Sequence, residues 1–250
     1  MIIYFSATGN SKYVAQEISR HTNDEIISLV RLYNDGEYHL DLTDEEYFGV
    51  ITPTYFGGLP KIVEEYVSKL QITGNPYTYV VSTYGTGSGA STKIVEKHLR
   101  GLTNAKFNLQ MPDTWTPSFD LSTPEKIAKF TQNTEKDLQT IITNIVNKNE
   151  GNFARKEMPI AITKLSYKLY DKSSKTVNFN VEDTCRGCGL CVKSCPINAL
   201  ELKDDRPEWI KESCLICLRC LHRCPEFSIQ YKDKTKNHGQ YTHPEIKKFD

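Results

Sequence analysis

The eight cysteines of the chain all lie between residues 185 and 224. They form two runs with one spacing, C-x2-C-x2-C-x3-C-P, which start at Cys185 and Cys214. This spacing is typical of 4Fe-4S sites, because three thiolates on one tight turn reach three irons of a cubane. The pattern therefore predicts iron–sulfur chemistry, in which a cluster takes up or releases one electron at a time.

The two runs are copies of one unit, because Cys185 and Cys214 lie 29 positions apart and the likeness extends beyond the sulfurs. Residues 181–184 (VEDT) correspond to residues 210–213 (IKES), and residues 195–200 (CPINAL) correspond to residues 224–229 (CPEFSI). An internal repeat of a cluster-binding unit predicts two clusters.

The fourth cysteine of each run precedes a proline, which turns the backbone away from the other three. We therefore expect it to bind the neighbouring cluster. One cluster would take Cys185, Cys188, Cys191 and Cys224. The other would take Cys214, Cys217, Cys220 and Cys195. This exchange of ligands requires the two clusters to be close neighbours.

Zinc sites and disulfides are the alternatives for such cysteines. Structural zinc needs two C-x2-C pairs separated by a longer loop, and a third cysteine two residues further on has no role there. The spacing therefore favours iron. The second run also carries Arg219, His222 and Arg223, whereas the first run has Gly187 and Gly189. Positive charge favours the reduced form of a cluster, so we expect unequal potentials.

The composition predicts two domains, because 250 residues with 38% hydrophobic residues suffice for one medium and one small core. The 31 acidic and 31 basic residues cancel, which excludes a general attraction to nucleic acid or an anionic membrane. We see no apolar run of membrane-spanning length and no leader with a cleavage site. Thiolates spaced for iron need a reducing environment, so we expect an oxygen-sensitive cytoplasmic protein of an anaerobe.

Upstream of the cysteines, short apolar runs alternate with amphipathic stretches, which predicts strands alternating with helices. The expected strands are residues 1–6, 25–29, 47–52, 77–83 and 105–111, and the expected helices are residues 12–21, 61–70, 90–100 and 124–147. This order predicts an α/β domain with a doubly wound parallel sheet. The last helix should bury Ile127, Phe130, Leu138, Ile141, Ile142, Ile145 and Val146.

Three loops follow the carboxyl ends of predicted strands, where doubly wound sheets bind ligands: residues 6–11, 52–60 and 83–89. The first loop offers hydroxyl groups, a glycine and a helix N-terminus to a phosphate. Taken alone, a plain turn with a Ser or Asn cap explains it equally well.

Residues 1 to about 150 resemble a flavodoxin, because the phosphate-loop motif of that family, S/T-x-T-G-N-T, is present at residues 6–11 with a final serine. The resemblance implies that FMN is the cofactor and that its phosphate is held by Ser6, Thr8, Gly9, Asn10 and Ser11. It also implies that the flavin ring is flanked by Pro53, Thr54, Tyr55, Phe56, Gly57, Gly58, Thr83, Tyr84, Gly85 and Gly87. Tyr55, Phe56 and Tyr84 are candidates for stacking on the ring. Flavodoxins are typically acidic and this chain is neutral, which puts the usual basic partners in doubt.

Residues 85–90 also fit the dinucleotide pattern G-x-G-x-x-G/A between a strand and a helix. That fingerprint belongs to the first strand–helix turn of its unit and needs an acidic residue on the following strand. The strand expected at residues 105–111 has none, so a nicotinamide site is the weaker alternative.

The remaining segments divide the chain into a flavodoxin-like domain (1–150), a linker (151–176), a ferredoxin-like domain (177–232) and a polar tail (233–250). Residues 177–231 resemble a bacterial two-cluster ferredoxin, which implies a small α+β domain with two 4Fe-4S clusters. The linker should pack partly on one domain. The tail is expected to be solvated rather than a docking arm, and we assign no chemistry to the six histidines.

The whole chain thus resembles a flavodoxin–ferredoxin fusion, which implies electron transfer between FMN and two clusters, with redox proteins as donor and acceptor. One alternative is an FMN-dependent reductase of a quinone or another small electrophile, which would keep a pocket above the flavin. Another is a redox sensor. We find no acid–base group that names a substrate, and we expect neither nucleic acid nor membrane as a partner. A homodimer stays open.

Overall fold

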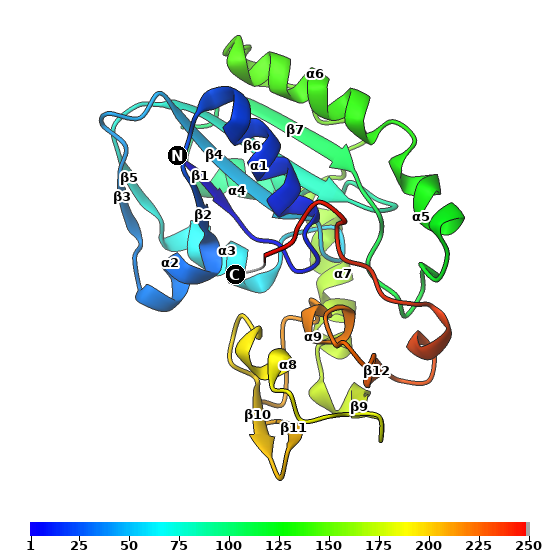
Figure 1. The fold of residues 1–250 in the computed structure, drawn as a ribbon. Helices are drawn as coiled ribbons and strands as arrows, with labels where there is room; N and C mark the ends of the chain where they lie inside the picture. The colour runs from blue at the N-terminus through cyan, green and yellow to red at the C-terminus, as the bar shows by residue number, and fades with distance from the viewer. Residues whose placement is uncertain (249–250) are drawn as a thin grey trace.

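The structure, a computed structural model, describes residues 1–248 apart from the side chain of Lys164. Its largest element is a sheet with the strand order β2-β1-β4-β6-β7-β8, and every pairing in it is parallel (Figure 1). The strands are β1 (Ile2–Tyr4), β2 (Ile26–Ser28), β4 (Tyr47–Pro53), β6 (Tyr77–Tyr84), β7 (Ala105–Gln110) and β8 (Gly151–Asn152). The strand order reverses beside β1, as the predicted doubly wound arrangement requires.

Helices cover both faces of the sheet (Figure 1). On one face lie α1 (Asn10–Thr22) and α6 (Thr134–Val146), and on the other lie α2 (Leu29–Asp35), α3 (Lys61–Lys69) and α4 (Ser91–His98). Ile2 and Tyr4 join the first core whereas Ile3 joins the second, because side chains alternate along a strand. A sheet buried on both faces needs strands that are apolar at nearly every position, which is the pattern of the sequence.

The expected single helix over residues 124–147 is wrong. The structure has two helices there, α5 (Pro124–Thr131) and α6, and α5 buries none of its residues. It lies beyond the edge of the sheet (Figure 1), so Ile127 and Phe130 are only partly buried. Val146 is 41% exposed at the end of α6, so three of the residues expected in the core do not belong to it.

A short parallel pair, β3 (His39–Asp41) with β5 (Gln71–Thr73), and the helix α2 are not in the sequence prediction. Each strand of this pair has only three residues, too few for an alternating pattern to show. The pair lies at the left of Figure 1, beside α2.

The segment expected to be a linker contains the helix α7 (Ile160–Ser173), which runs from the sheet towards the cysteine-rich domain (Figure 1). Two tyrosines in its C-terminal half bond it to both domains. The Tyr167 hydroxyl accepts a hydrogen bond from Leu59 N at 2.8 Å, and the Tyr170 hydroxyl donates to Leu215 O at 3.0 Å. The connection between the domains is therefore a helix that is bonded to both of them.

The cysteine-rich domain, residues 174–232, contains two antiparallel pairs: β9 (Phe179–Val181) with β12 (Ile229–Tyr231), and β10 (Leu200–Lys203) with β11 (Arg206–Trp209). The single-turn helices α8 (Leu190–Lys193) and α9 (Arg219–His222) occupy equivalent places in the two cysteine runs. A third apolar core joins this domain to the loops of the sheet, because Ile216 and Leu218 pack with Phe56 and Trp115. The two domains therefore form a continuous body.

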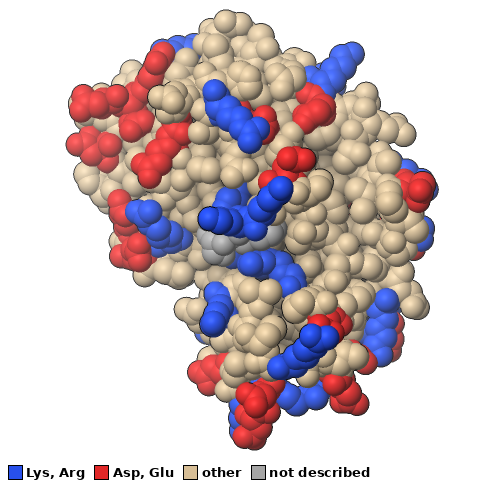
Figure 2. Space-filling model, in the orientation of Figure 1, with Lys and Arg blue, Asp and Glu red and all other residues tan. Residues whose placement is uncertain are grey.

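The C-terminal segment, defined as residues 235–246, is packed on the protein, so the expectation of a solvated tail is wrong for it. Thr235 is fully buried, and Tyr241 and Ile246 are 7% and 6% exposed. The sequence pattern did not indicate this burial, because the buried residues are few and lie between exposed polar ones. The charges on the face shown in Figure 2 are mixed, with acidic side chains gathered near β3 and β5 and basic ones near the C-terminus. Among the described residues, no helix has the length and apolarity needed to cross a bilayer.

Candidate cofactor site

A cavity of about 390 Å³ opens at the carboxyl ends of β1, β4, β6 and β7. This is the edge of a doubly wound sheet at which ligands bind. All three loops expected to bind a ligand form part of its wall. Of the residues expected to hold FMN, all except Gly9 and Gly58 line the cavity.

The first loop is held by hydrogen bonds that leave the start of α1 open. Gly9 has the left-handed φ of 105°, and its N–H donates to Ser6 Oγ at 3.1 Å. The hydroxyls of Ser11 and Thr83 lie 2.9 Å apart, which ties this loop to the end of β6. The Asn10 side-chain amide bonds this loop to the segment after β7, because Nδ2 donates to Pro112 O at 3.1 Å.

The second loop turns tightly at Phe56 and Gly57, whose φ values are 49° and 77°. Tyr55 and Gly58 pair with each other across the turn, and the Ser166 hydroxyl of α7 donates to Phe56 O. The Phe56 ring stacks on Tyr170 at 5.0 Å between ring centroids, so one of its faces is occupied by the protein. Tyr55 and Tyr84, the other two candidates for stacking on the flavin ring, do not stack on Tyr170.

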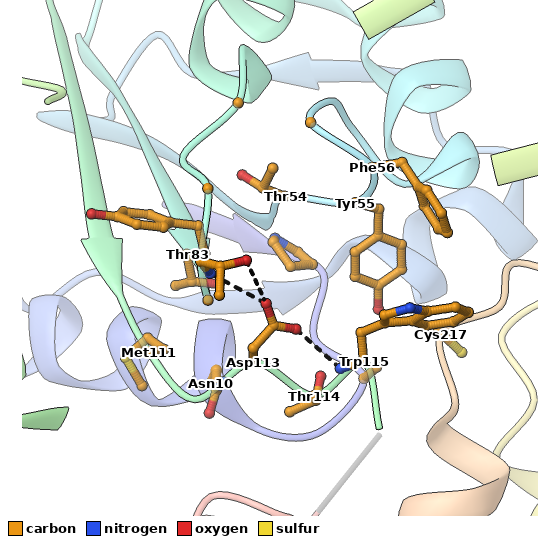
Figure 3. A pocket seen from close by; sticks show the side chains of 18 of the residues that line it. Asn10, Thr54, Tyr55, Phe56, Thr83, Met111, Asp113, Thr114, Trp115 and Cys217 are labelled. Atoms are coloured by element: carbon orange, nitrogen blue, oxygen red, sulfur yellow. Dashed lines mark hydrogen bonds between the residues drawn. The ribbon is translucent and has the colours of Figure 1, made fainter. Parts of the chain in front are cut away.

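A fourth loop, residues 111–115 after β7, also forms the wall and was missed by the sequence argument (Figure 3). The signal for it was available, since Pro112-Asp113 follows a predicted strand at the same edge. The Asp113 carboxylate accepts hydrogen bonds from the N–H and hydroxyl of Thr86, both at 3.2 Å, and from Trp115 N at 3.1 Å. Burial raises the pKa of Asp113, and these hydrogen bonds oppose the shift.

The cysteine-rich domain closes the cavity. Ile216, Cys217 and Leu218 lie in its wall together with the phosphate-loop residues, although they are more than 200 positions away from that loop in the sequence. Cys217 appears beside Tyr55 and Trp115 in Figure 3. A predicted cluster ligand and a predicted flavin loop therefore border one space.

Arg219 connects the two regions directly. Its guanidinium donates to Ser6 O at the start of the phosphate loop and to Ser194 O at 3.2 Å, and the residue is 3% exposed. Burial raises the pKa of the Cys217 thiol to about 11, and the Arg219 charge opposes this by favouring the thiolate. A buried cation beside a predicted cluster ligand fits a site that holds negative charge.

A second, small cavity is lined by Cys185, Cys188, Cys191 and Cys224. These are the four cysteines expected to share one cluster, including the one contributed by the other run. The remaining four also lie near one another. After burial, the pKa of Cys214 is raised by Cys217 and Cys195, and that of Cys220 by Cys217, Cys214 and Cys195.

Backbone N–H groups point at the sulfurs in a pattern that repeats between the runs. Ala199 N donates to Cys195 Sγ at 3.2 Å, and Ser228 N donates to Cys224 Sγ at 3.3 Å, so each fourth cysteine is bonded by the residue four positions later. Hydrogen bonds to cluster sulfurs are one of the means by which proteins tune reduction potentials. Among residues 1–248, no three His, Cys, Asp or Glu side chains converge on a site for a single metal ion.

Family models match both parts of the chain. One described as a flavodoxin domain matches residues 1–140, and one described as a 4Fe-4S dicluster domain matches residues 184–229. The chain belongs to the flavodoxin-domain family. Because the dicluster match follows the flavodoxin match, it is a flavodoxin–ferredoxin fusion, which confirms the resemblance and the fold expected from the sequence.

Two solved structures are similar to part of the chain. A flavodoxin from the domain Archaea has 16% identity and a TM-score of 0.35, covering 58% of this chain and 96% of that one. Rubredoxin oxygen:oxidoreductase from the anaerobe Desulfovibrio gigas has 13% identity and a TM-score of 0.33, covering 58% of this chain and 36% of that one. A search of the curated proteins found no match.

The flavodoxin domain fits FMN at the start of α1. Within the described chain no side chain caps this helix, and its first hydrogen bond runs from Tyr13 N to Gly9 O at 2.8 Å. The N–H groups of residues 10 and 11 precede that bond and carry the positive end of the helix dipole. A phosphate supplies the acceptor and the negative charge that such a terminus favours.

The cysteine-rich domain fits iron–sulfur clusters by the chemistry of its donors. Burial raises the pKa of the Cys191 and Cys217 thiols to about 11, so each is protonated at neutral pH when no metal is bound. Bound iron would displace these protons, and the Cys191 and Cys217 thiolates would be among its ligands. FMN and iron–sulfur chemistry are therefore both consistent with the residues present.

Proposed function

We propose that the chain transfers electrons between two 4Fe-4S clusters and FMN. In this proposal one cluster is held by Cys185, Cys188, Cys191 and Cys224. The other is held by Cys214, Cys217, Cys220 and Cys195. Bound FMN exchanges two electrons singly and each cluster exchanges one, so the protein would couple one-electron to two-electron carriers.

The observation that carries the proposal is the shared wall of the 390 Å³ cavity. Cys217 borders the same space as Thr8 and Asn10 of the phosphate loop, with no intervening layer of protein. A cluster ligand placed there brings the second cluster next to the flavin site. Ile216 and Leu218, 3% and 2% exposed, flank Cys217 in the sequence and give this part of the wall an apolar surface.

The exposure of the cysteines suggests which of the two proposed clusters meets other proteins. Cys188 is exposed, whereas all the other cysteines are partly buried. We propose that redox partners exchange electrons with the cluster of Cys188, and that the cluster of Cys217 relays them to or from the flavin. The positions of the two cavities support this order, since only the larger one reaches the flavin loops.

The test is anaerobic purification with quantification of iron, sulfide and FMN, followed by rapid mixing with a small one-electron reductant. We expect one FMN and about eight irons and eight sulfides per chain. Electron paramagnetic resonance and absorbance should then show the cluster signals and the flavin approaching one common redox equilibrium. Zinc without flavin, or a flavin that stays oxidised while both clusters are reduced by a stronger reductant, would refute the proposal.

A reductase of small acceptors is the second candidate, and Asp113 favours it. Its carboxyl lies in the cavity wall, where it is the acid–base group nearest to an acceptor bound there, and burial raises its pKa while hydrogen bonds from Trp115 and Thr86 lower it. Turnover of a small naphthoquinone should then fall at least about tenfold in Asp113→Asn while FMN content stays constant. Equal turnover in the variant and the parent chain would leave Asp113 the structural role of joining residues 86 and 115.

A further inference from the structure

The C-terminal segment begins on the cysteine-rich domain and is bonded there to the second cysteine run. The Gln240 amide donates to Leu221 O at 2.7 Å and to Cys224 O at 2.8 Å. Tyr241 N donates to His222 Nδ1 at 3.2 Å, so His222 carries its proton on Nε2, which donates to Thr114 O at 2.9 Å. The segment is thus attached to α9 and to the fourth cavity loop.

The next residues lie on the phosphate loop. The Tyr241 hydroxyl donates to Asn10 Oδ1 at 3.0 Å, and His243 N donates to Thr8 O at 2.8 Å. A Cβ at Gly9 would lie 2.8 Å from the Cβ of His243, so this glycine is required by the segment as well as by its φ of 105°. Three consecutive residues of the loop are therefore in contact with the C-terminal segment.

Packing holds the segment in place. The His243 ring stacks on Tyr13 with 4.1 Å between ring centroids and an interplanar angle of 20°. Burial lowers the pKa of His243 to about 4, so the stacked ring is neutral at pH 7. Ile246 joins the core between α1 and the sheet. A segment bound by stacking, burial and hydrogen bonds orders the backbone that it contacts.

These contacts fix the groups that border the phosphate site. Thr8 and Asn10 line the cavity, and both atoms held by the segment, Thr8 O and Asn10 Oδ1, belong to them. With Tyr241 on Oδ1 and Pro112 O on Nδ2, the Asn10 amide has one orientation. The orientation of the N–H groups at the start of α1 therefore depends on a loop that the C-terminal segment holds in place.

We propose that residues 240–246 are part of the binding site for a phosphorylated flavin. Tyr241 and His243 are positioning residues that keep Thr8, Gly9 and Asn10 in the geometry that binds the phosphate, and Gln240 ties this geometry to the turn before Cys224. The proposal rests on FMN binding, as in the function proposed above. It implies that the flavodoxin domain alone has an incomplete phosphate site.

A segment that only stabilises the fold would give a different result from one that orders the phosphate loop. A loss of general stability weakens the binding of FMN and of riboflavin alike, because both contain the flavin ring. Loss of phosphate-loop geometry weakens FMN alone, because riboflavin lacks the phosphate. The ratio of the two dissociation constants therefore separates the two roles.

The experiment uses the full chain with its clusters loaded and the flavin removed, and titrates it anaerobically with FMN or riboflavin, followed by flavin fluorescence. The variants are Tyr241→Phe and a truncation after Gln240. Their controls are Tyr33→Phe, which removes a tyrosine hydroxyl bonded to Glu65 on the surface, and a truncation after Ile246. For Tyr241→Phe we expect the FMN dissociation constant to rise about 2- to 10-fold, as for one lost hydrogen bond.

The truncation after Gln240 should raise the FMN dissociation constant more than about tenfold, since it also removes the His243 bond and the Ile246 packing, with riboflavin changed less than about twofold. Both controls should match the parent chain. An equal loss for the two flavins, or no loss in either variant, would overturn the proposal.

Hydrogen exchange provides a second readout that does not depend on flavin. Amides of residues 8–13 should exchange at least about tenfold faster in the truncation after Gln240 than in the truncation after Ile246, in the flavin-free chain. If the parent chain bound no flavin, the proposed function would fail while this measurement would still test the segment. Equal exchange rates in the two truncations would refute its positioning role.

Discussion

The two cysteine runs share their spacing but differ in what surrounds it. In the first run Cys188 is exposed and the run lines only a small cavity of its own. In the second run the equivalent residue, Cys217, lies in the wall of the 390 Å³ cavity that we propose binds the flavin. The first run therefore faces solvent and the second faces the flavodoxin domain.

The same backbone is built from different residues in the two runs. Gly187 and Gly189 have φ values of 67° and 70°, and the equivalent residues of the second run, Ile216 and Leu218, have φ values of 47° and 55°. The left-handed region suits glycine and costs about 1–2 kcal/mol for other residues, and a β-branched residue there is a genuine outlier. Burial of the Ile216 and Leu218 side chains offsets this backbone strain, because both form the apolar wall beside Cys217.

The charge at the next position also differs. Leu190 follows Gly189 in the first run, and Arg219 follows Leu218 in the second. Arg219 is buried and bonded to Ser6 O, whereas Leu190 is partly buried beside the first cavity. The comparison teaches that two copies of one cysteine repeat can keep the same backbone turn while one copy faces solvent and the other packs against a second domain.

Loss of one cysteine from each run should give the largest difference. Cys217→Ser and Cys188→Ser should each lower the iron content from about eight to about four per chain. Reduction of the flavin through the clusters should be abolished in Cys217→Ser and retained in Cys188→Ser when a small reductant bypasses the first cluster. Rapid mixing with absorbance and paramagnetic resonance measures this, and identical flavin kinetics in the two variants would remove the distinction between the runs.

An alanine at Gly187 should destabilise the first run strongly. Its Cβ would lie 2.6 Å from Asp205 O and would adopt a left-handed φ, so we expect a loss of about 2–4 kcal/mol in the free energy of unfolding. The matched variant Ile216→Gly relieves strain while losing burial, so its stability should change by less than about 2 kcal/mol, with weaker flavin retention. Anaerobic chemical denaturation measures both. A larger loss in Ile216→Gly than in Gly187→Ala would contradict the assignment of strain.

Removal of the Arg219 charge should lower the potential of the second cluster only. For Arg219→Gln we expect a shift of the order of 50–100 mV, because a unit charge a few ångströms away in a partly buried site is worth about 1–2 kcal/mol. Arg219→Lys keeps the charge and should shift less, and Leu190→Gln is the control at the equivalent position. Spectroelectrochemical titration measures the two potentials. Two equal potentials in the parent chain, or shifts of both clusters together, would show that Arg219 does not distinguish them.

The smallest expected effect concerns pH, because only the second run is attached to the C-terminal segment. Burial lowers the pKa of His243 from 6.5 to about 4, so below pH 6.5 the unfolded chain binds a proton that the folded chain does not. The free energy of unfolding should therefore fall as the pH falls, by about 1 kcal/mol between pH 7 and pH 5.5. His243→Gln should remove that part of the pH dependence. Parallel denaturation curves for the parent and the variant at both pH values would show that His243 is not buried as a neutral ring.

Much of the fold was predictable because its signals are local. The apolar strands, the helices α1, α3 and α4 and the motif at residues 6–11 each lie within a short stretch of sequence. The break between α5 and α6 was missed, because an apolar spacing that continues across residues 132–133 does not reveal where the sheet ends. The buried C-terminal segment was missed for a related reason, since four buried residues among more exposed ones make no periodic pattern.

By itself, the sequence predicted the chemistry of this protein: two runs of thiolates suited to iron, and a hydroxyl- and glycine-rich loop suited to a phosphate. These depend on residue type and on spacing of a few positions, which the covalent chain alone controls. The tertiary structure decided which cysteine meets the flavin cavity, where Asp113 and Trp115 lie, and that Tyr241 reaches Asn10. Cys217 and Tyr241 lie more than 200 positions from the phosphate loop, and Asp113 lies 27 positions from Thr86, so only burial of the folded chain brings these residues together.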